Sequence, residues 1–254
     1  MDKGIKRYLT AVFSFSWGMW GIAILLTRTG AASFGAPIML IPYMLGGLSP
    51  AMCIIYLKKR YCTAAEFRDF KQNIVNHRHP VYWYLLILVI TFLFGFIPTL
   101  YGGSVMVNPV YMALLELPVM IVGGGLEEIG WRGFLQPALQ KRFSIVVSTG
   151  IVSLIWTTWH LPLWFMPGSN QEKMNILYFF LINIALSYLY SAVYNRTKSI
   201  FLCIIMHAFT NGFWDVYRPD SRILPALPVL VLSLIIFCLL IGGNKLTIRA
   251  EEMS

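Results

Sequence analysis

The sequence predicts an all-α, polytopic membrane protein with about eight transmembrane helices around a polar intramembrane cavity. Of its 254 residues, 57% are hydrophobic and only 12% are charged, and the mean hydropathy is +0.67. A soluble domain averages roughly 25% charged residues. The apolar residues also gather in runs of about 20, the length that a helix needs to cross a bilayer. Polar residues that interrupt several of these runs predict the cavity.

The eight predicted spans follow from the positions of these apolar runs. The first and the eighth runs are the clearest, and the seventh is short. We expect the first to be a retained helix, because no short hydrophobic stretch with a small-residue cleavage site precedes it. The predicted spans cover residues 8–27, 33–57, 81–100, 109–126, 143–166, 174–194, 199–214 and 223–243.

The basic residues predict the orientation of these spans. If the connections alternate between the two sides, fifteen of the twenty Lys and Arg fall on one face. Because cytoplasmic loops carry an excess of Lys and Arg, both termini are predicted to be cytoplasmic. The +9 net charge is therefore a topology signal, and we expect no nucleic-acid partner, since the basic residues form no single cluster. The short loops and small size favour the plasma membrane of a prokaryote.

We interpret residues 1–254 as a single integral-membrane domain. Its longest cytoplasmic connection, about 58–80, carries Phe67, Phe70 and Ile74 at helical spacing among basic residues. Such an amphipathic segment is expected to lie on anionic membrane lipid.

Two glutamates and an arginine stand in the nearly uncharged stretch GGGLEEIGWRGF, residues 123–134. A charge at the bilayer centre costs about 2.5–3.5 kcal/mol, so these side chains must face protein or water. One alternative is that they mark the cytoplasmic end of the fourth span. Glu128 and Arg132 are four apart with the acid first, which favours an intrahelical ion pair. Glu127 points about 100° away and stays available for chemistry. The preceding glycines are expected to leave room for a water or a substrate backbone beside Glu127.

Two later spans also carry polar groups. His160 lies in IWTTWHLPLW, and His207 and Asn211 lie four apart in CIIMHAFTNGFW, on one helix face. A single membrane histidine is commonly a helix-to-helix hydrogen bond. Three segments with polar groups at similar depth instead favour convergence on one cavity.

The residue types in such a cavity suit the hydrolysis of an amide. Glu127 can take a proton from water as a general base, and His160 can hold or share that water. His207 and Asn211 can donate hydrogen bonds to the oxyanion, and one such donor is worth about 2.7–4 kcal/mol. Glu128 and Arg132 would support the site.

A metal site is the main chemical alternative. Zinc or another divalent metal in a hydrolytic site takes three protein ligands and a water, and Glu127, His160 and His207 suffice in number. Neither membrane histidine is part of an HExxH motif, so we favour no metal and no other cofactor. A serine or cysteine nucleophile is less favoured, because no GxSxG motif occurs.

With these residues, the chain resembles the CPBP family of intramembrane proteases. This family groups CAAX prenyl endopeptidases of the Rce type with bacteriocin-processing and immunity (Abi-like) proteins. The family motif Glu-Glu-x-x-x-Arg matches Glu127, Glu128 and Arg132. Phe-x-x-x-His matches residues 156–160, with Trp156 in place of phenylalanine, and His-x-x-x-Asn matches residues 207–211. The resemblance covers about residues 110–215.

The resemblance implies eight helices whose motifs meet in a cavity open toward the cytoplasm. It implies proteolysis near the C-terminus of a membrane-associated substrate. In that family the counterparts of Glu127 and His160 are thought to activate water, and those of His207 and Asn211 to form the oxyanion hole. The family has also been described as metalloproteases.

The predicted function is therefore that of an intramembrane endopeptidase acting on a membrane-associated peptide or protein. A prenylated tail, a pheromone precursor and a bacteriocin leader all fit such a cavity. The alternative is a non-enzymatic immunity, scaffold or transport protein that retains the fold.

Overall fold

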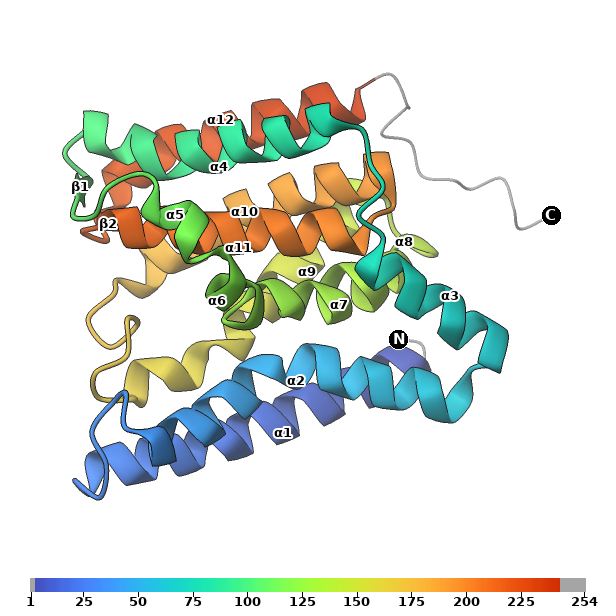
Figure 1. Cartoon of the computed structure of the whole chain (residues 1–254), viewed down its shortest axis with the longest axis horizontal. Coiled ribbons are helices and arrows are strands. Elements are labelled where there is room, and N and C mark those ends of the chain that lie inside the picture. Colours follow the sequence, from blue (N-terminus) through green and yellow to red (C-terminus); the bar gives the residue numbers. More distant parts are fainter. Residues whose placement is uncertain (1–2, 243–254) are drawn as a thin grey trace.

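A computed structural model describes residues 3–242, and long helices dominate this part of the chain (Figure 1). Most of the long helices run roughly along the longest axis of the molecule, as expected for helices that cross a bilayer side by side. The long helices are α1 (Lys3–Arg28), α2 (Pro37–Tyr61), α4 (Val81–Leu100), α9 (Ile145–Trp159), α10 (Ile176–Thr197), α11 (Ile200–Val216) and α12 (Ile223–Ile241).

The prediction of a polytopic all-α membrane protein is confirmed. In the described residues, six helical segments are long and apolar enough to cross a membrane. They are α1, α2, α4, α10, α12 and α9 together with the 3-10 turn η3 (Leu161–Phe165). The shorter apolar helix α11 corresponds to the short seventh predicted span. Seven of the eight predicted runs are thus helical segments of the expected kind.

The prediction of one continuous span over residues 109–126 is wrong. This stretch forms the short helices α5 (Met112–Leu115) and α6 (Leu117–Val122), and then the 3-10 turn η1 (Gly125–Glu127). Pro118 lies at the start of α6, where its missing N–H is tolerated, and glycines 123–125 follow its end. Proline and glycine disfavour a helix interior, so an apolar run containing both breaks into pieces.

The broken segment continues through three further short elements before the next long helix. These are α7 (Glu128–Gly130), the π-helical turn η2 (Trp131–Leu135) and α8 (Gln136–Gln140). A π-helical turn inside a helix is rare and is frequent at functional sites. The charged motif is therefore carried by irregular helix in the middle of the molecule.

Two short strands, which the sequence analysis did not predict, connect the ends of two helices. Strand β1 (Ser104–Met106) follows α4, and β2 (Tyr217–Pro219) follows α11. They pair antiparallel, with Val105 opposite Arg218. The pairing ties the end of α4 to the end of α11.

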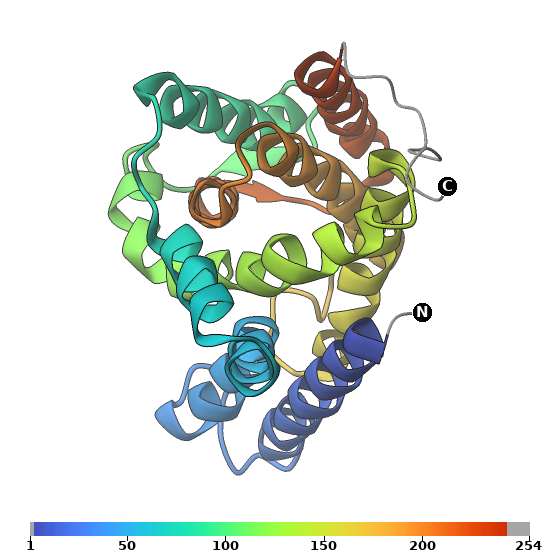
Figure 2. The same cartoon turned by 90° about the vertical axis from the view of Figure 1, so that its right-hand side faces the viewer.

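Helices α10 and α11 lie at the centre of the bundle (Figure 2). Helix α10 packs against α9 and α12, and α11 packs against α4 and α6. A buried polar cluster also joins three elements: Gln136 of α8 donates to Ser191 of α10, and Thr149 of α9 lies 2.7 Å from the same hydroxyl. The motif-bearing segments are therefore held on several sides by packed helices.

The predicted amphipathic connection contains helix α3 (Ala64–Val75). Thr63 and Glu66 form a capping box at its start. Phe70 is buried, and Asn73 accepts from the Ile200 backbone N–H and donates to the Lys198 carbonyl. Part of the apolar face of α3 therefore packs on the protein at the α10–α11 turn. Its contact with anionic lipid stays a prediction.

Candidate active site

The structure brings the four predicted catalytic side chains to the wall of one cavity. Glu127, His160, His207 and Asn211 all line a cavity of about 490 Å³. They come from η1, from the end of α9 and from α11, which are far apart in the sequence. The polar groups of the three predicted segments therefore converge as the sequence analysis expected.

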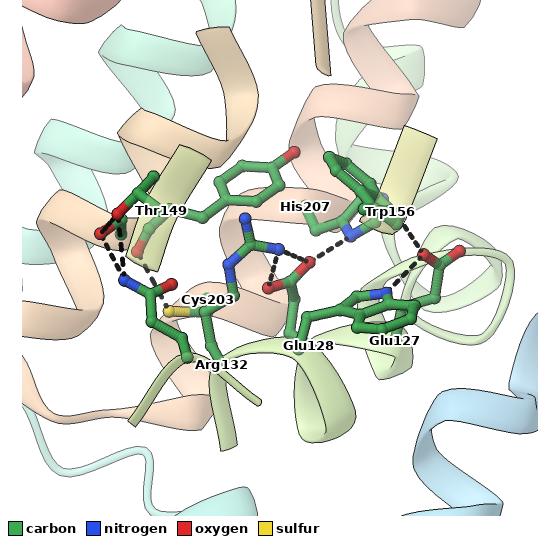
Figure 3. Close-up of polar contacts among 11 residues, drawn as sticks. Glu127, Glu128, Arg132, Thr149, Trp156, Cys203 and His207 are labelled. Carbon is green, nitrogen blue, oxygen red and sulfur yellow. Dashed lines mark hydrogen bonds and ion pairs between the residues drawn. The ribbon is translucent and has the colours of Figure 1, made fainter. Parts of the chain in front are cut away.

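Glu127 is held in place by two tryptophans (Figure 3). Its Oε2 accepts from Trp156 Nε1 at 2.8 Å and from Trp131 Nε1 at 3.4 Å. Only 8% of the residue is exposed. Within the described residues Oε1 has no hydrogen-bond partner, so one oxygen is anchored and the other is open to a ligand in the cavity.

The predicted ion pair between Glu128 and Arg132 is present, and it includes a third residue. Arg132 Nη1 lies 2.9 Å from Glu128 Oε2, and both side chains are fully buried. Glu128 Oε1 also lies 2.9 Å from His207 Nδ1 (Figure 3). The sequence analysis missed this contact, because no spacing rule links residues 79 positions apart. Glu128 thus orients His207 as well as Arg132.

Arg132 is also enclosed by aromatic rings. Its guanidinium carbon lies 5.5 Å from the ring centre of Trp156 and 5.1 Å from that of Tyr190. A guanidinium over an aromatic face is attracted by the ring quadrupole. This charge therefore has an ionic and an aromatic neighbour in a segment where an unpaired charge is costly.

The backbone fixes the tautomer of His160. Its Nδ1 lies 2.8 Å from the carbonyl oxygen of Trp156, one helical turn earlier. Because a carbonyl only accepts, Nδ1 must carry the hydrogen. In neutral His160 the lone pair is then on Nε2, the atom that can accept a proton or a water hydrogen.

Glycine at position 124 lets the backbone of the charged motif approach α11 closely. A Cβ added there would lie 2.3 Å from Asn211 Nδ2 and 3.1 Å from His207 Nε2. Gly123 and Gly124 both line the cavity beside Glu127, but Asn211 and His207 occupy the side of Gly124 on which a Cβ would stand. Gly125 likewise faces the Ile204 carbonyl, 2.8 Å from an added Cβ.

Substitution of Gly124 by alanine is expected to lower kcat about 100-fold. The added methyl group would displace the Asn211 amide. In the role that the sequence predicts for Asn211, this is the loss of one oxyanion donor, which costs about 10²–10³ in kcat. Gly47→Ala is the matched control, because Gly47 also lines the cavity and an added Cβ there meets nothing within 4 Å. Steady-state rates of peptide cleavage measure both. Equal losses in the two variants would contradict the predicted role of Asn211.

The alternative metal site would use Glu127, His160 and His207 as ligands. These three side chains are not grouped as a metal centre in this structure. Among residues 3–242, no three His, Cys, Asp or Glu side chains are grouped so that they can hold a metal ion.

The cavity lies toward one end of the bundle. Buried Glu127 and His207 lie in its depth, and exposed Asn170, Lys173 and Arg218 also line it.

We call this end of the bundle the cavity end. It is formed by β1, β2 and the connections α1–α2 and η3–α10, and β1 and β2 are on the left of Figure 1. The described start of α1 is at the opposite end. A cytoplasmic N-terminus and a cavity open to the cytoplasm, both predicted above, are therefore incompatible.

Comparison with known proteins agrees with the motif pattern. A family model described as type II CAAX prenyl endopeptidase Rce1-like matches residues 108–213. The protein named CAAX prenyl protease 2 of Methanococcus maripaludis is 24% identical over 225 residues, covering 81% of this chain and 82% of that protein. The matched region contains the four cavity-lining candidates Glu127, His160, His207 and Asn211.

Proposed function

Because this chain belongs to the CPBP family of intramembrane proteases, we propose that it hydrolyses a peptide bond near the end of a membrane-associated peptide or protein. The observation that carries the proposal is the convergence of Glu127, His160, His207 and Asn211 on one cavity. This set supplies a base, a second proton-handling group and two candidate oxyanion donors.

Water activation is assigned to Glu127 and His160. A water in the cavity gives a proton to the open oxygen of Glu127 as it attacks the carbonyl carbon. His160, with its lone pair on Nε2, accepts the second hydrogen of that water and holds it in position. The proton on Glu127 then passes to the leaving amine, which restores the carboxylate.

Oxyanion stabilisation is assigned to His207 and Asn211. Nδ1 of His207 donates to the Glu128 carboxylate, so Nε2 is a second donor only in the imidazolium form. The Glu128 carboxylate, 2.9 Å from Nδ1, is placed to pair with that form. A charged donor together with the neutral amide of Asn211 suits the negative charge of the tetrahedral intermediate.

The proposal is tested with purified protein in lipid nanodiscs. The probes are synthetic peptides that end in a CAAX sequence, with and without a farnesyl group, and peptides with a single apolar anchor. Mass spectrometry is expected to show one cleavage near the end of at least one class. If protein shown to be folded leaves every peptide uncut, the proposal is contradicted.

Substitution of Trp156 by phenylalanine is expected to lower kcat about 10-fold or more. The ring stays apolar, but the 2.8 Å hydrogen bond to Glu127 is lost, and a bond to a charged group is worth about 1.5–3 kcal/mol. Trp164→Phe is the matched control, because it removes an indole bond of 2.8 Å to the Met174 carbonyl. If both variants lose the same activity, Trp156 does not position Glu127.

Removal of divalent metals is expected to leave activity unchanged. Glu127, His160 and His207 are not grouped to hold a metal ion. The proposed water activation and oxyanion stabilisation use side chains alone. Protein treated with a chelator and shown by elemental analysis to lack zinc should cleave the same peptide at the same rate. Loss of activity that zinc restores would reverse the assignment.

A further inference from the structure

We propose that the cavity opens on the extracytoplasmic side, so that the substrate is a membrane-anchored peptide or protein segment displayed on that side. The substrate part of this inference rests on the proposed function. The orientation part does not, because it follows from where the cavity and the basic residues lie along the helices.

The cavity is confined to one half of the helices that cross the membrane. Helix α1 contributes Trp20 from its second half, and α2 contributes Tyr43 and Met44 from its first half. Helix α9 contributes its last residues, including Trp159, and α10 contributes Phe179 near its start. All of these positions are nearer to the cavity end than to the opposite end.

The mouth of the cavity is also at the cavity end. Its exposed polar lining residues belong to the η3–α10 connection and to β2 with the turn that follows, whereas Glu127 and His207 are buried. Exposed Val122 and Gly123, at the end of α6, also line the cavity. A route therefore runs from these connections down to the candidate catalytic groups. The exposed polar lining residues of the mouth are Asn170, Lys173, Arg218 and Asp220.

The basic residues gather at the opposite end of the same helices. That end, which we call the basic end, is formed by the start of α1, the end of α2, α3, the start of α9 and the α10–α11 turn (Figures 1 and 2). In the described residues the basic end carries Lys3, Lys6, Arg7, Lys58, Lys59, Arg60, Arg68, Lys71, Arg78, Lys141, Arg142, Arg196 and Lys198. The cavity end carries Arg28, Lys173, Arg218 and Arg222.

This thirteen-to-four distribution determines the orientation. Lys and Arg in short connections are retained on the cytoplasmic side, and Asp and Glu have little effect on orientation. The basic end is therefore cytoplasmic, and the mouth faces the other side. The N-terminus is then cytoplasmic, as the sequence predicted, and the cavity does not open toward the cytoplasm, as the family resemblance had implied.

The lining of the cavity indicates what part of a substrate it accepts. Trp20, Tyr43, Met44 and Phe179 present apolar surface on the way to the polar groups. Apolar lining with a few placed polar groups is typical of sites that bind apolar ligand groups. An apolar segment next to the scissile bond fits this wall, as expected for a peptide that leaves the membrane on the extracytoplasmic side.

Cysteine labelling in intact cells tests the orientation without any need for activity. In a background with all four native cysteines replaced by alanine, Asn170→Cys places a thiol at the mouth and Gln72→Cys places one on α3. A membrane-impermeant maleimide is expected to label position 170 in intact cells and position 72 only after permeabilisation. The reverse pattern overturns the proposal. A cytoplasmic marker protein that stays unlabelled establishes that the cells are sealed.

A second measurement keeps the native cysteines and so does not depend on the folding of the cysteine-free chain. Helix α12 ends at the basic end, so a green fluorescent protein fused after the last residue is expected to be fluorescent, as it is when cytoplasmic. A dark fusion at normal membrane abundance overturns the orientation.

The substrate side is tested with two membrane-anchored reporters that carry the peptide cleaved best by purified protein. One displays this peptide outside the cell and the other displays it inside. Only the external reporter is expected to be cut, and cleavage of the internal reporter alone overturns the proposal. If purified protein cleaves nothing, the proposed function fails, while the labelling pattern still decides the orientation.

Discussion

Replacement of Glu127 with glutamine is expected to lower kcat by about 10²-fold to 10⁴-fold, the range that a general base contributes. Glutamine has nearly the same shape, and its amide oxygen can still accept the hydrogen bonds from Trp156 and Trp131. It cannot take a proton from water at neutral pH. The variant should therefore fold, bind substrate with little change in KM and turn it over slowly. Single-turnover cleavage of a peptide, followed by mass spectrometry, measures the loss.

Glu116→Gln is the matched control for this prediction. Glu116 is a partly buried glutamate in the same broken segment, and it does not line the cavity. Its replacement by glutamine removes one negative charge, as the Glu127 substitution does, but leaves the proposed general base in place. Full activity of the Glu127 variant, or equal losses in the two variants, would remove Glu127 from the mechanism.

The sequence distinguished the two neighbouring glutamates because helical geometry is local. Glu128 and Arg132 are four positions apart, and Glu127 and Glu128 are adjacent, so the ion pair and the differently directed carboxylate follow from 3.6 residues per turn. The pair is found as predicted. The contact from Glu128 to His207 and the bond from Trp156 to Glu127 join distant segments. Only the packing of α9 and α11 against the motif creates them.

The long apolar helices were predictable for a related reason. A run of about 20 apolar residues leaves the chain few alternatives in a bilayer, because every backbone group must be satisfied within the segment. The stretch 109–126 is equally apolar, yet Pro118 and the three glycines weaken the helix. Its neighbours in the bundle then decide its path. The β1–β2 pairing was also missed, since its strands of three residues are too short to show a pattern.

Replacement of Glu128 with glutamine is expected to lower both stability and activity. The substitution leaves the fully buried Arg132 without a counter-charge, and breaking a buried pair costs about 3–5 kcal/mol. It also removes the carboxylate that lies 2.9 Å from His207 Nδ1 and holds the ring in place, so the proposed donation from Nε2 to the oxyanion is weakened. We expect a lower Tm in detergent and a loss of about 100-fold in kcat, the scale of one oxyanion donor.

The double variant Glu128→Gln with Arg132→Met separates these two effects. Removing both partners avoids an unpaired buried charge, and replacing a buried pair by an apolar group is often neutral or stabilising. Methionine also fills the space between Trp156 and Tyr190 that the guanidinium occupies. Stability should therefore return toward that of the natural chain. Activity should stay low, because His207 still lacks its carboxylate. If the double variant regains activity together with its Tm, Glu128 serves only to neutralise Arg132, and His207 does not act as a charged donor.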